Sequence, residues 1–353
     1  MQNPPTTADV RRMPKVLLHD HLDGGLRPTT MLELADEIGY RGLPTGDPAD
    51  LAAYLHTGAA RRDHHLYLAM FEYTVGVMQT ADGLQRVARE SVEDLAADGV
   101  VYAEIRFAPE LHTQQGLDMA GVVEAVLDGL DAGDRATGTT ARLIVDAIRS
   151  EGRADDAVDA AIAHAGRGVV GFDLAGAEDG HPASRHREAI ERARDAGLHV
   201  TIHAGEAWGL PSIEDALDVG AQRLGHGVRL IDDVAADGTL GPVARRVTDS
   251  HVTLEVCPTS NVHTGAAPSI AAHPIERLRD AGVAVTVNTD NRLMSDVTLT
   301  GELITVARAF GWDLARIRDV TLTALDAAFC DDKTRSGIAA LVDDGYERLS
   351  IAT

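Results

Sequence analysis

The chain has 353 residues, 44% of them hydrophobic and 25% charged, so it is long enough to bury a sizeable core. Its formal net charge of −23 would be repelled by phosphate backbones and by anionic membranes, which argues against nucleic acid or a membrane as a partner. No stretch approaches about 18 uninterrupted apolar residues, and residues 1–13 lack the apolar core of a signal peptide. We therefore expect a cytoplasmic protein, whose oligomeric state the sequence leaves open.

Lysine and cysteine are both scarce. The only lysines are Lys15 and Lys333, and neither lies near a predicted strand end where chemistry takes place. This excludes Schiff-base and pyridoxal-phosphate enzymes, which need a lysine inside the pocket. The two cysteines, Cys257 and Cys330, are too few for a disulfide framework.

Strand and helix patterns alternate along the chain. Eight short apolar or β-branched runs predict strands at 16–19, 100–107, 143–148, 169–174, 199–203, 223–226, 252–257 and 283–289. Helical spacing lies between them at 83–97, 119–136, 154–165, 184–196 and 275–281. Eight such alternations predict an α/β fold, a (β/α)8 TIM barrel.

Two regions hold more helix than a barrel needs. Residues 24–99 carry helical patterns at 29–38 and 64–78, and an insertion after the first strand emerges on the catalytic face, so we expect it to roof the active site. Further helices at 295–310 and 314–328 are expected to close the barrel after its last strand. Since no Pro/Gly/Ser linker divides the chain, we expect residues 1–353 to form a single domain.

Polar side chains recur at the predicted strand ends, which converge on one pocket in a barrel. His19 and His21 project to the same side of an extended strand, and Asp23 follows them in a turn. His203 and Asp290 follow later strands. Three histidines and one carboxylate suit Zn²⁺ or a similar first-row ion and leave a position for water, whose pKa a metal lowers toward about 7.

Two further residues at strand ends are candidates for proton transfer. Glu206 lies three residues past His203 and, in an apolar site, can keep a proton and give it to a ring nitrogen or leaving group. The alternative is a carboxylate that only stabilises a helix start. His226 lies between two glycines and can reach a metal-bound water, or it is a core histidine bonded to backbone.

Most of the other histidines fall in helical or loop stretches. We expect these to be solvated surface residues: His56, His64, His65, His112, His164, His186 and His273.

Six ordered motifs resemble the adenosine deaminase family of metal-dependent amidohydrolases over essentially the whole chain. They are LHDHLDG at 18–24, DLAG at 173–176, HAGE at 203–206, LGHG at 224–227, CPTSN at 257–261 and NTD at 288–290. The resemblance implies deamination of adenosine, and of 2′-deoxyadenosine, to inosine or deoxyinosine and ammonia.

The resemblance also implies roles for particular residues. One Zn²⁺ per chain would be held by His19, His21, His203 and Asp290. The catalytic residues would be Glu206, which protonates purine N1, His226, which orients the attacking hydroxide, and Asp290. The substrate would be bound by His21, by Asp23 at the ribose 5′-hydroxyl, by the Gly176 backbone at purine N3, and by Asn291.

Asn291 departs from the family pattern, which commonly has an aspartate there, and Arg292 follows it in place of proline. An aspartate must be protonated to donate a hydrogen bond to purine N7, whereas an asparagine amide donates without this. We therefore expect the change to affect which purine analogues the site tolerates. Free adenine, AMP or a modified adenine nucleoside stays open as substrate, although relatives that deaminate adenine usually carry glutamate where this chain has Asp23. A nucleoside-binding barrel without turnover is the remaining alternative.

Overall fold

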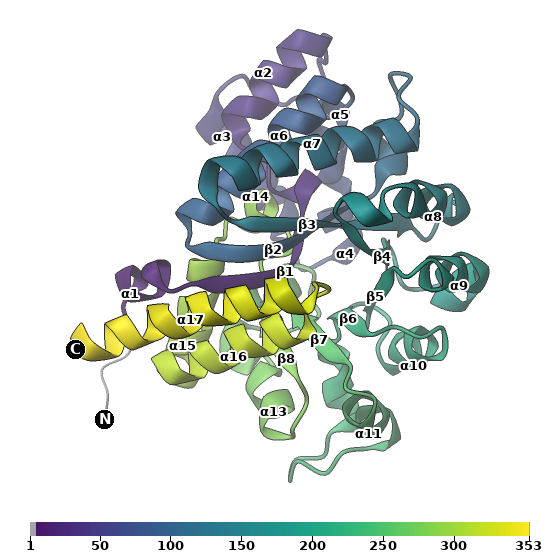
Figure 1. Ribbon diagram of the computed structural model, residues 1–353. Coiled ribbons are helices and arrows are strands. Elements are labelled where there is room, and N and C mark those ends of the chain that lie inside the picture. Colours follow the sequence, from purple (N-terminus) through teal and green to yellow (C-terminus); the bar gives the residue numbers. More distant parts are fainter. Residues whose placement is uncertain (1–4, 353) are drawn as a thin grey trace.

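Eight parallel strands form the centre of the computed structural model, which describes residues 5–352 (Figure 1). They pair in chain order from β1 to β8. Their bounds are β1 (Lys15–His21), β2 (Val100–Phe107), β3 (Thr140–Ile148), β4 (Val169–Ala175), β5 (His199–Ala204), β6 (Arg223–His226), β7 (Thr253–Val256) and β8 (Val285–Val287). The predicted (β/α)8 barrel is therefore confirmed.

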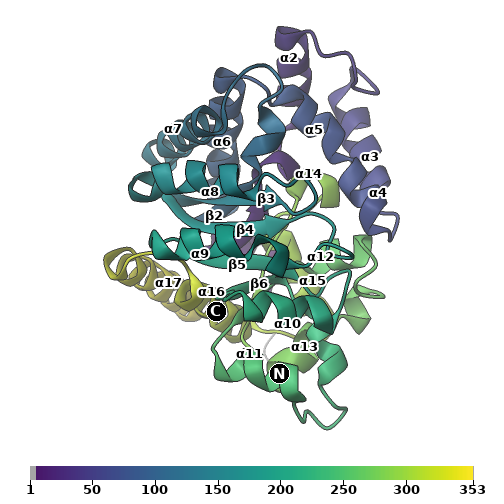
Figure 2. The same ribbon diagram turned by 90° about the vertical axis from the view of Figure 1, so that its right-hand side faces the viewer.

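Helices surround the strands. α1 (Thr7–Arg12) precedes β1, and α2 (Pro28–Ile38), α3 (Pro48–Ala59), α4 (His64–Ala69), α5 (Phe71–Val77) and α6 (Ala81–Ala97) follow it. Between later strands lie α7 (Met119–Thr137), α8 (Ala154–Ala163), α9 (Arg187–Asp195), α10 (Leu210–Asp218), α11 (Pro242–Asp249), α12 (Pro258–His263) and α13 (Ile275–Asp280). After β8 come α14 (Arg292–Ser295), α15 (Leu299–Phe310), α16 (Leu314–Ala327) and α17 (Asp332–Ala352). Figure 2 shows α2 to α5 gathered on one side, apart from α8 to α11.

The barrel closes between β1 and β8 through Asp290, which lies three residues beyond the end of β8. The backbone N–H of His21 donates to the Asp290 carbonyl at 2.7 Å, and the Asp290 N–H donates to the His19 carbonyl at 3.0 Å. Closure leaves the sheet without an open edge at this seam. It also fixes Asp290 beside both histidines of β1.

The predicted strands all appear, with small shifts at their ends. The run at 283–289 forms a shorter strand, because the chain leaves regular pairing before it reaches Asp290. The helical pattern at 64–78 is divided at Met70 into α4 and α5, and the pattern at 184–196 begins as a 3-10 turn before α9. Hydrophobic spacing does not distinguish these tighter turns from α-helix.

Successive side chains along a strand point alternately into the barrel and outward to the helices, and the two sides differ in composition. In β7, Glu255 points into the barrel, where it contacts Arg106 and Arg223. Its neighbour Leu254 therefore points outward toward the helices, and it is fully buried in the apolar core. At this point of the barrel the packing between strand and helices is hydrophobic, while charged groups occupy part of the barrel interior.

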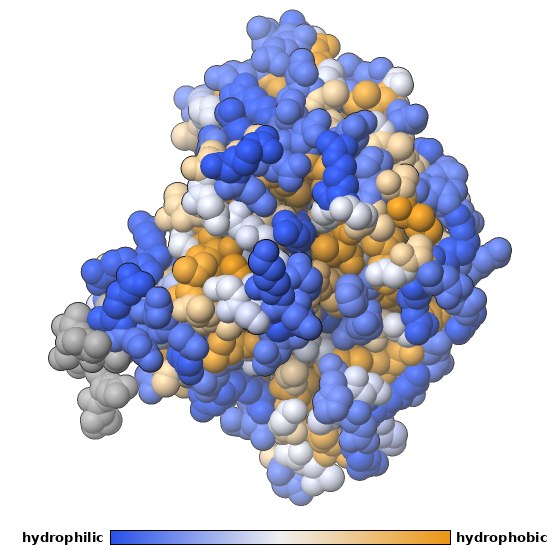
Figure 3. All heavy atoms as spheres, in the orientation of Figure 1, coloured by the Kyte–Doolittle hydropathy of each residue, from blue (hydrophilic) through white to orange (hydrophobic). Residues whose placement is uncertain are grey.

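The surface shown in Figure 3 is largely hydrophilic, and apolar residues show between the hydrophilic ones. Among the described residues, the large apolar side chains that are clearly exposed are Tyr54, Leu66 and Leu341. None of the helices within residues 5–352 combines the length and apolar character that a membrane span requires.

Leu254→Ala tests the outer apolar layer. Removing a fully buried leucine leaves a cavity, so we expect the free energy of unfolding to fall by about 2–5 kcal/mol. Leu341→Ala is the matched control, because Leu341 is 48% exposed, and should change stability by about 0.5 kcal/mol or less. If urea unfolding showed the same decrease in the free energy of unfolding for both variants, Leu254 would not belong to a buried apolar layer.

Candidate active site

A cavity of about 340 Å³ lies at the carboxyl ends of the strands. Helices α4 and α5 supply Tyr67, Leu68 and Phe71 to its wall. All but one of the site residues predicted from the sequence line it: His21, Asp23, Gly176, His203, Glu206, His226, Asp290 and Asn291. The exception, His19, is fully buried, with its ring 4.7 Å from that of His203 between centroids.

Four side chains converge as one candidate metal centre. One ligand atom from each of His19, His21, His203 and Asp290 lies within 4.8 Å of the others. Asp290 Oδ1 is 3.2 Å from His19 Nε2 and 3.4 Å from His21 Nε2. Within the described residues, the buried His19 Nε2 has no hydrogen-bond partner. Nitrogen and oxygen donors around an unsatisfied imidazole fit a divalent first-row ion.

A buried carboxylate lies behind each of these histidines. Nδ1 of His19 is 3.0 Å from Glu255 Oε2, and Nδ1 of His203 is 2.8 Å from Asp173 Oδ2. Nδ1 of His21 is 3.5 Å from Asp146 Oδ2. The contact between His19 and Glu255 is a hydrogen bond. A carboxylate at this position favours the ring proton on Nδ1, which leaves Nε2 available to a metal ion.

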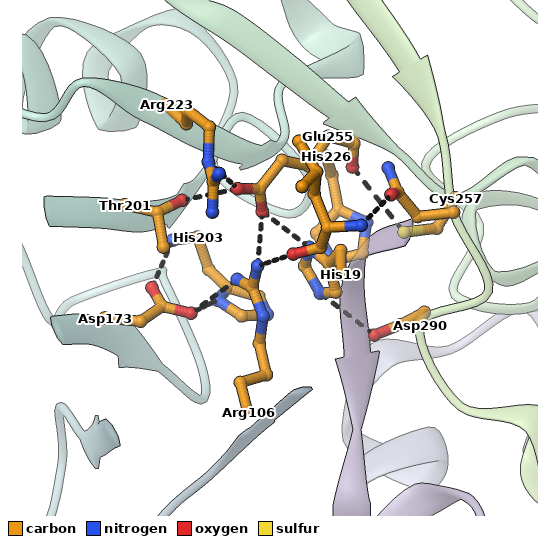
Figure 4. A network of polar contacts seen from close by, with 12 residues as sticks. His19, Arg106, Asp173, Thr201, His203, Arg223, His226, Glu255, Cys257 and Asp290 are labelled. Carbon is orange, nitrogen blue, oxygen red and sulfur yellow. Dashed lines mark hydrogen bonds and ion pairs between the residues drawn. The ribbon is translucent and has the colours of Figure 1, made fainter. Parts of the chain in front are cut away.

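Arg106 ties two of these carboxylates together (Figure 4). Its guanidinium donates to Asp173 at 2.8 Å and to Glu255 at 2.7 Å, and all three side chains are fully buried. Burial alone would raise the pKa of Glu255, but Arg106 and Arg223 outweigh it and hold that pKa well below its usual range. Both carboxylates thus stay ionised behind the histidines.

Glu206 presents one carboxyl oxygen to the pocket. Its Oε1 accepts hydrogen bonds from the Thr264 hydroxyl at 2.7 Å and the Asn261 amide at 3.4 Å. Its Oε2 lies 3.5 Å from Nε2 of both His226 and His64. Because Oε1 is occupied, Oε2 is the oxygen that can carry a transferable proton.

Glu178 holds the turn that carries Glu206. Its carboxylate accepts from the backbone N–H groups of Gly205 at 2.9 Å, Glu206 at 2.9 Å and Ala207 at 3.1 Å. Burial raises its pKa, but Arg149 and the donors from this turn outweigh it and lower the pKa overall. Sequence analysis missed Glu178, because its spacing from Glu206 carries no recognisable pattern.

His226 and Asp290 both adopt backbone conformations that favour glycine, with φ of 62° and 57°. Left-handed backbone at a non-glycine residue costs of order 1–3 kcal/mol, and it is common at functional sites. Burial lowers the pKa of His226, which keeps its ring neutral near pH 7.

Three other residues of the pocket wall offer side-chain or backbone groups to a ligand: Asp23, Gly176 and Asn291. Asp23 is buried, and its Oδ1 has no hydrogen-bond partner in the part of the chain that the structure describes. Gly176 has φ of 87°, which suits glycine. Asn291 packs against Gly24, where a Cβ would come within 1.8 Å of the amide oxygen.

Three histidines contradict the expectation that they lie on the surface. His112 and His273 are buried, with relative exposures of 0% and 3%, and His64 lines the pocket. His112 Nε2 lies 3.8 Å from Asp23 Oδ2, and its Nδ1 contacts the Met78 carbonyl at 2.9 Å. The expectation was wrong because it treated helical and loop segments as exposed, whereas these segments fold over the strand ends.

Glu255→Gln tests whether the buried carboxylates support the metal centre. The variant removes the charge behind His19 and beside Arg106, so we expect zinc affinity to fall about 10- to 100-fold. Affinity is measured by competition with a chelator on protein shown to be folded by circular dichroism. Glu191→Gln, on the exposed surface of α9, is the control. Unchanged affinity in folded Glu255→Gln would contradict the proposed support.

Comparison with known proteins agrees with this geometry. The family model described as adenosine deaminase matches residues 14–345. An adenosine deaminase from Mycolicibacterium vanbaalenii is 50% identical over 339 residues, covering 93% of this chain and 94% of that protein.

Two solved structures show the same fold. An adenine deaminase from Arthrobacter aurescens has a TM-score of 0.85 at 27% identity, covering 96% of this chain and 99% of that one. A Burkholderia ambifaria amidohydrolase with bound zinc has a TM-score of 0.85 at 25% identity, covering 98% of this chain and 94% of that one. The chain belongs to the adenosine deaminase family of hydrolytic enzymes.

Proposed function

We propose that this chain catalyses the zinc-dependent hydrolytic deamination of adenosine and 2′-deoxyadenosine in cytoplasmic purine salvage and catabolism. The observation that carries the proposal is the position of Glu206 Oε2 in the same cavity as the cluster of His21, His203 and Asp290. A proton donor and a metal centre facing one small cavity are what hydrolysis at a ring carbon requires.

One Zn²⁺ per chain would be held by His19, His21, His203 and Asp290. When bound, it lowers the pKa of water so that a nucleophile is available near neutral pH. The chain's own residues supply the remaining requirements. His226 orients the attacking oxygen, since its ring is neutral and faces the pocket.

Glu206 acts as the general acid. It donates the proton on Oε2 to purine N1, which removes the aromatic resistance of the ring to attack at C6. The attacking oxygen forms a bond to C6, its remaining proton passes to the amino group, and the C6–N bond breaks to release ammonia and leave inosine with its proton on N1. Glu178 keeps the backbone of Glu206 in place during this transfer, because it accepts three N–H groups of that turn.

The polar residues of the pocket wall, Asp23 among them, support a nucleoside as substrate. Asp23 would accept a hydrogen bond from the ribose 5′-hydroxyl, and it is next to His112. No lysine or arginine is among the described residues that line the cavity, whereas Asp23 and Glu72 are, so a 5′-phosphate would find no cationic partner and AMP is disfavoured. A modified adenine nucleoside is the second candidate, because Asn291 stands where the family commonly has aspartate.

The remaining substrate contacts come from the pocket wall and its roof. The Gly176 backbone would meet purine N3, Asn291 would donate to N7, and His21 would pack against the purine. We further propose that the chain forms one domain in which residues 24–99 act as the roof, since α4 and α5 supply apolar side chains to the cavity.

A substrate panel tests the proposed reaction. Zinc-loaded protein is assayed with adenosine, 2′-deoxyadenosine, adenine, AMP and N6-methyladenosine, and the two unmodified nucleosides should lose absorbance near the adenosine maximum. Glu206→Gln should keep its zinc and lower kcat by about 10²- to 10⁴-fold, because an amide cannot give up a proton to N1. Turnover of adenine or AMP without adenosine, or full activity in Glu206→Gln, would overturn the proposal.

A further inference from the structure

Beside the proposed catalytic groups, three buried side chains from separate segments form a chain of hydrogen bonds that ends on His226. His273 follows a 3-10 turn (Ile270–Ala272), Asn261 lies in α12, and His226 ends β6. Their relative exposures are 3%, 0% and 1%, so solvent does not compete for these contacts. In each hydrogen bond of this chain, the donor and the acceptor can be assigned from the hydrogen bond that precedes it.

The first link starts at a donor with a fixed role. The backbone N–H of Ile275 lies 3.2 Å from His273 Nδ1. A backbone N–H only donates, so this Nδ1 accepts. Burial lowers the pKa of His273 to about 4, so the ring is neutral near pH 7 and its single N–H proton lies on Nε2.

The second link orients an amide. His273 Nε2 lies 3.3 Å from Asn261 Oδ1 and, as a donor, requires the oxygen there. The amide nitrogen of Asn261 therefore faces the other way, 3.0 Å from His226 Nδ1 and 3.4 Å from Glu206 Oε1. Both of these atoms are acceptors for its two hydrogens.

The third link fixes the proton of the catalytic histidine. Because the Asn261 amide nitrogen only donates, His226 Nδ1 accepts, and the ring proton of neutral His226 lies on Nε2. We propose that His273 and Asn261 are positioning residues that hold His226 as the Nε2–H tautomer, with its N–H directed into the active-site pocket.

This inference rests on the proposed function, in which His226 acts on the oxygen that attacks C6. In the Nε2–H form His226 donates a hydrogen bond to that oxygen, so it orients the nucleophile and does not accept a proton from it. The His226 Nε2 atom also lies 3.5 Å from Glu206 Oε2. The two proposed catalytic groups therefore share one anchor, the amide of Asn261.

Asn261→Asp reverses the hydrogen-bond direction with almost no change of shape. A carboxylate only accepts, so it draws the proton of His226 to Nδ1 and leaves Nε2 without one. We expect the ¹⁵N NMR spectrum of the zinc-loaded, histidine-labelled protein to show the His226 N–H at Nε2 in the wild type and at Nδ1 in the variant. With adenosine, kcat should fall on the order of 10²-fold or more while KM changes little.

His273→Phe and His273→Gln separate the orienting role from packing. Phenylalanine keeps the ring but donates nothing to Asn261, so the His226 tautomers should mix and kcat should fall. Glutamine can accept from Ile275 and donate to Asn261, so it should restore the Nε2–H form and much of the activity. His164→Phe, at the end of α8 and outside the cavity lining, should leave the His226 spectrum and kcat unchanged.

The NMR measurement does not depend on turnover, so the two proposals fail separately. A wild type that leaves adenosine intact would overturn the proposed function. An Nε2–H signal that persists in Asn261→Asp, or an Nδ1–H signal in the wild type, would overturn the assigned positioning. If the His226 tautomer changed in Asn261→Asp while kcat stayed the same, the proposed link between this tautomer and catalysis would be overturned. If His273→Phe does not fold, the nearly isosteric Asn261→Asp still decides the question.

Discussion

The guanidinium of Arg106, fully buried in the barrel, lies between two carboxylates that each contact a histidine of the metal centre. Asp173 lies behind His203 and Glu255 lies behind His19, so one cation fixes both sides of the cluster (Figure 4). Removal of one partner from a buried ionic network leaves an uncompensated charge, at a cost of about 3–5 kcal/mol. The metal centre and the barrel interior therefore depend on the same electrostatic balance.

Arg223 extends this network toward the amino ends of the strands. It pairs with Glu255 and with Glu104 of β2, and its guanidinium stacks 3.6 Å from the ring centroid of Phe329. Barrel interiors are usually filled by branched apolar side chains, and here charged groups fill part of that space. The apolar layer outside the strands supplies the packing energy, while the inner charges hold the histidines in their orientations.

Much of the fold, and the cluster of His19, His21, His203 and Asp290 that could hold a metal ion, could be predicted from the sequence. The spacing of apolar residues predicts the alternating strands and helices of a barrel. Because the carboxyl ends of barrel strands meet at one face, the barrel also predicts that His19, His203 and Asp290 lie together. The closure of the barrel at Asp290 could not be predicted, since it depends on the register between β1 and the segment after β8. Glu206 and His226 could be picked out as candidates from their positions at strand ends, while their particular roles are implied by the family resemblance.

The residues that support the site could not be predicted in the same way. Glu178 and His273 act through contacts with backbone and side chains that are distant in sequence or lie in irregular loops. From sequence alone, a histidine in a loop is expected to be exposed to solvent, because the segment that covers it in the fold is not known. Tertiary packing, which spacing does not encode, decides which polar groups become buried partners.

X-ray absorption at the zinc edge of the zinc-loaded protein tests the metal centre most directly. We expect three imidazole nitrogens and carboxylate or water oxygens at about 2.0–2.2 Å, and no sulfur, although Cys257 is buried close to Glu255. A sulfur scatterer near about 2.3 Å, or a shell of oxygens without imidazole, would contradict it.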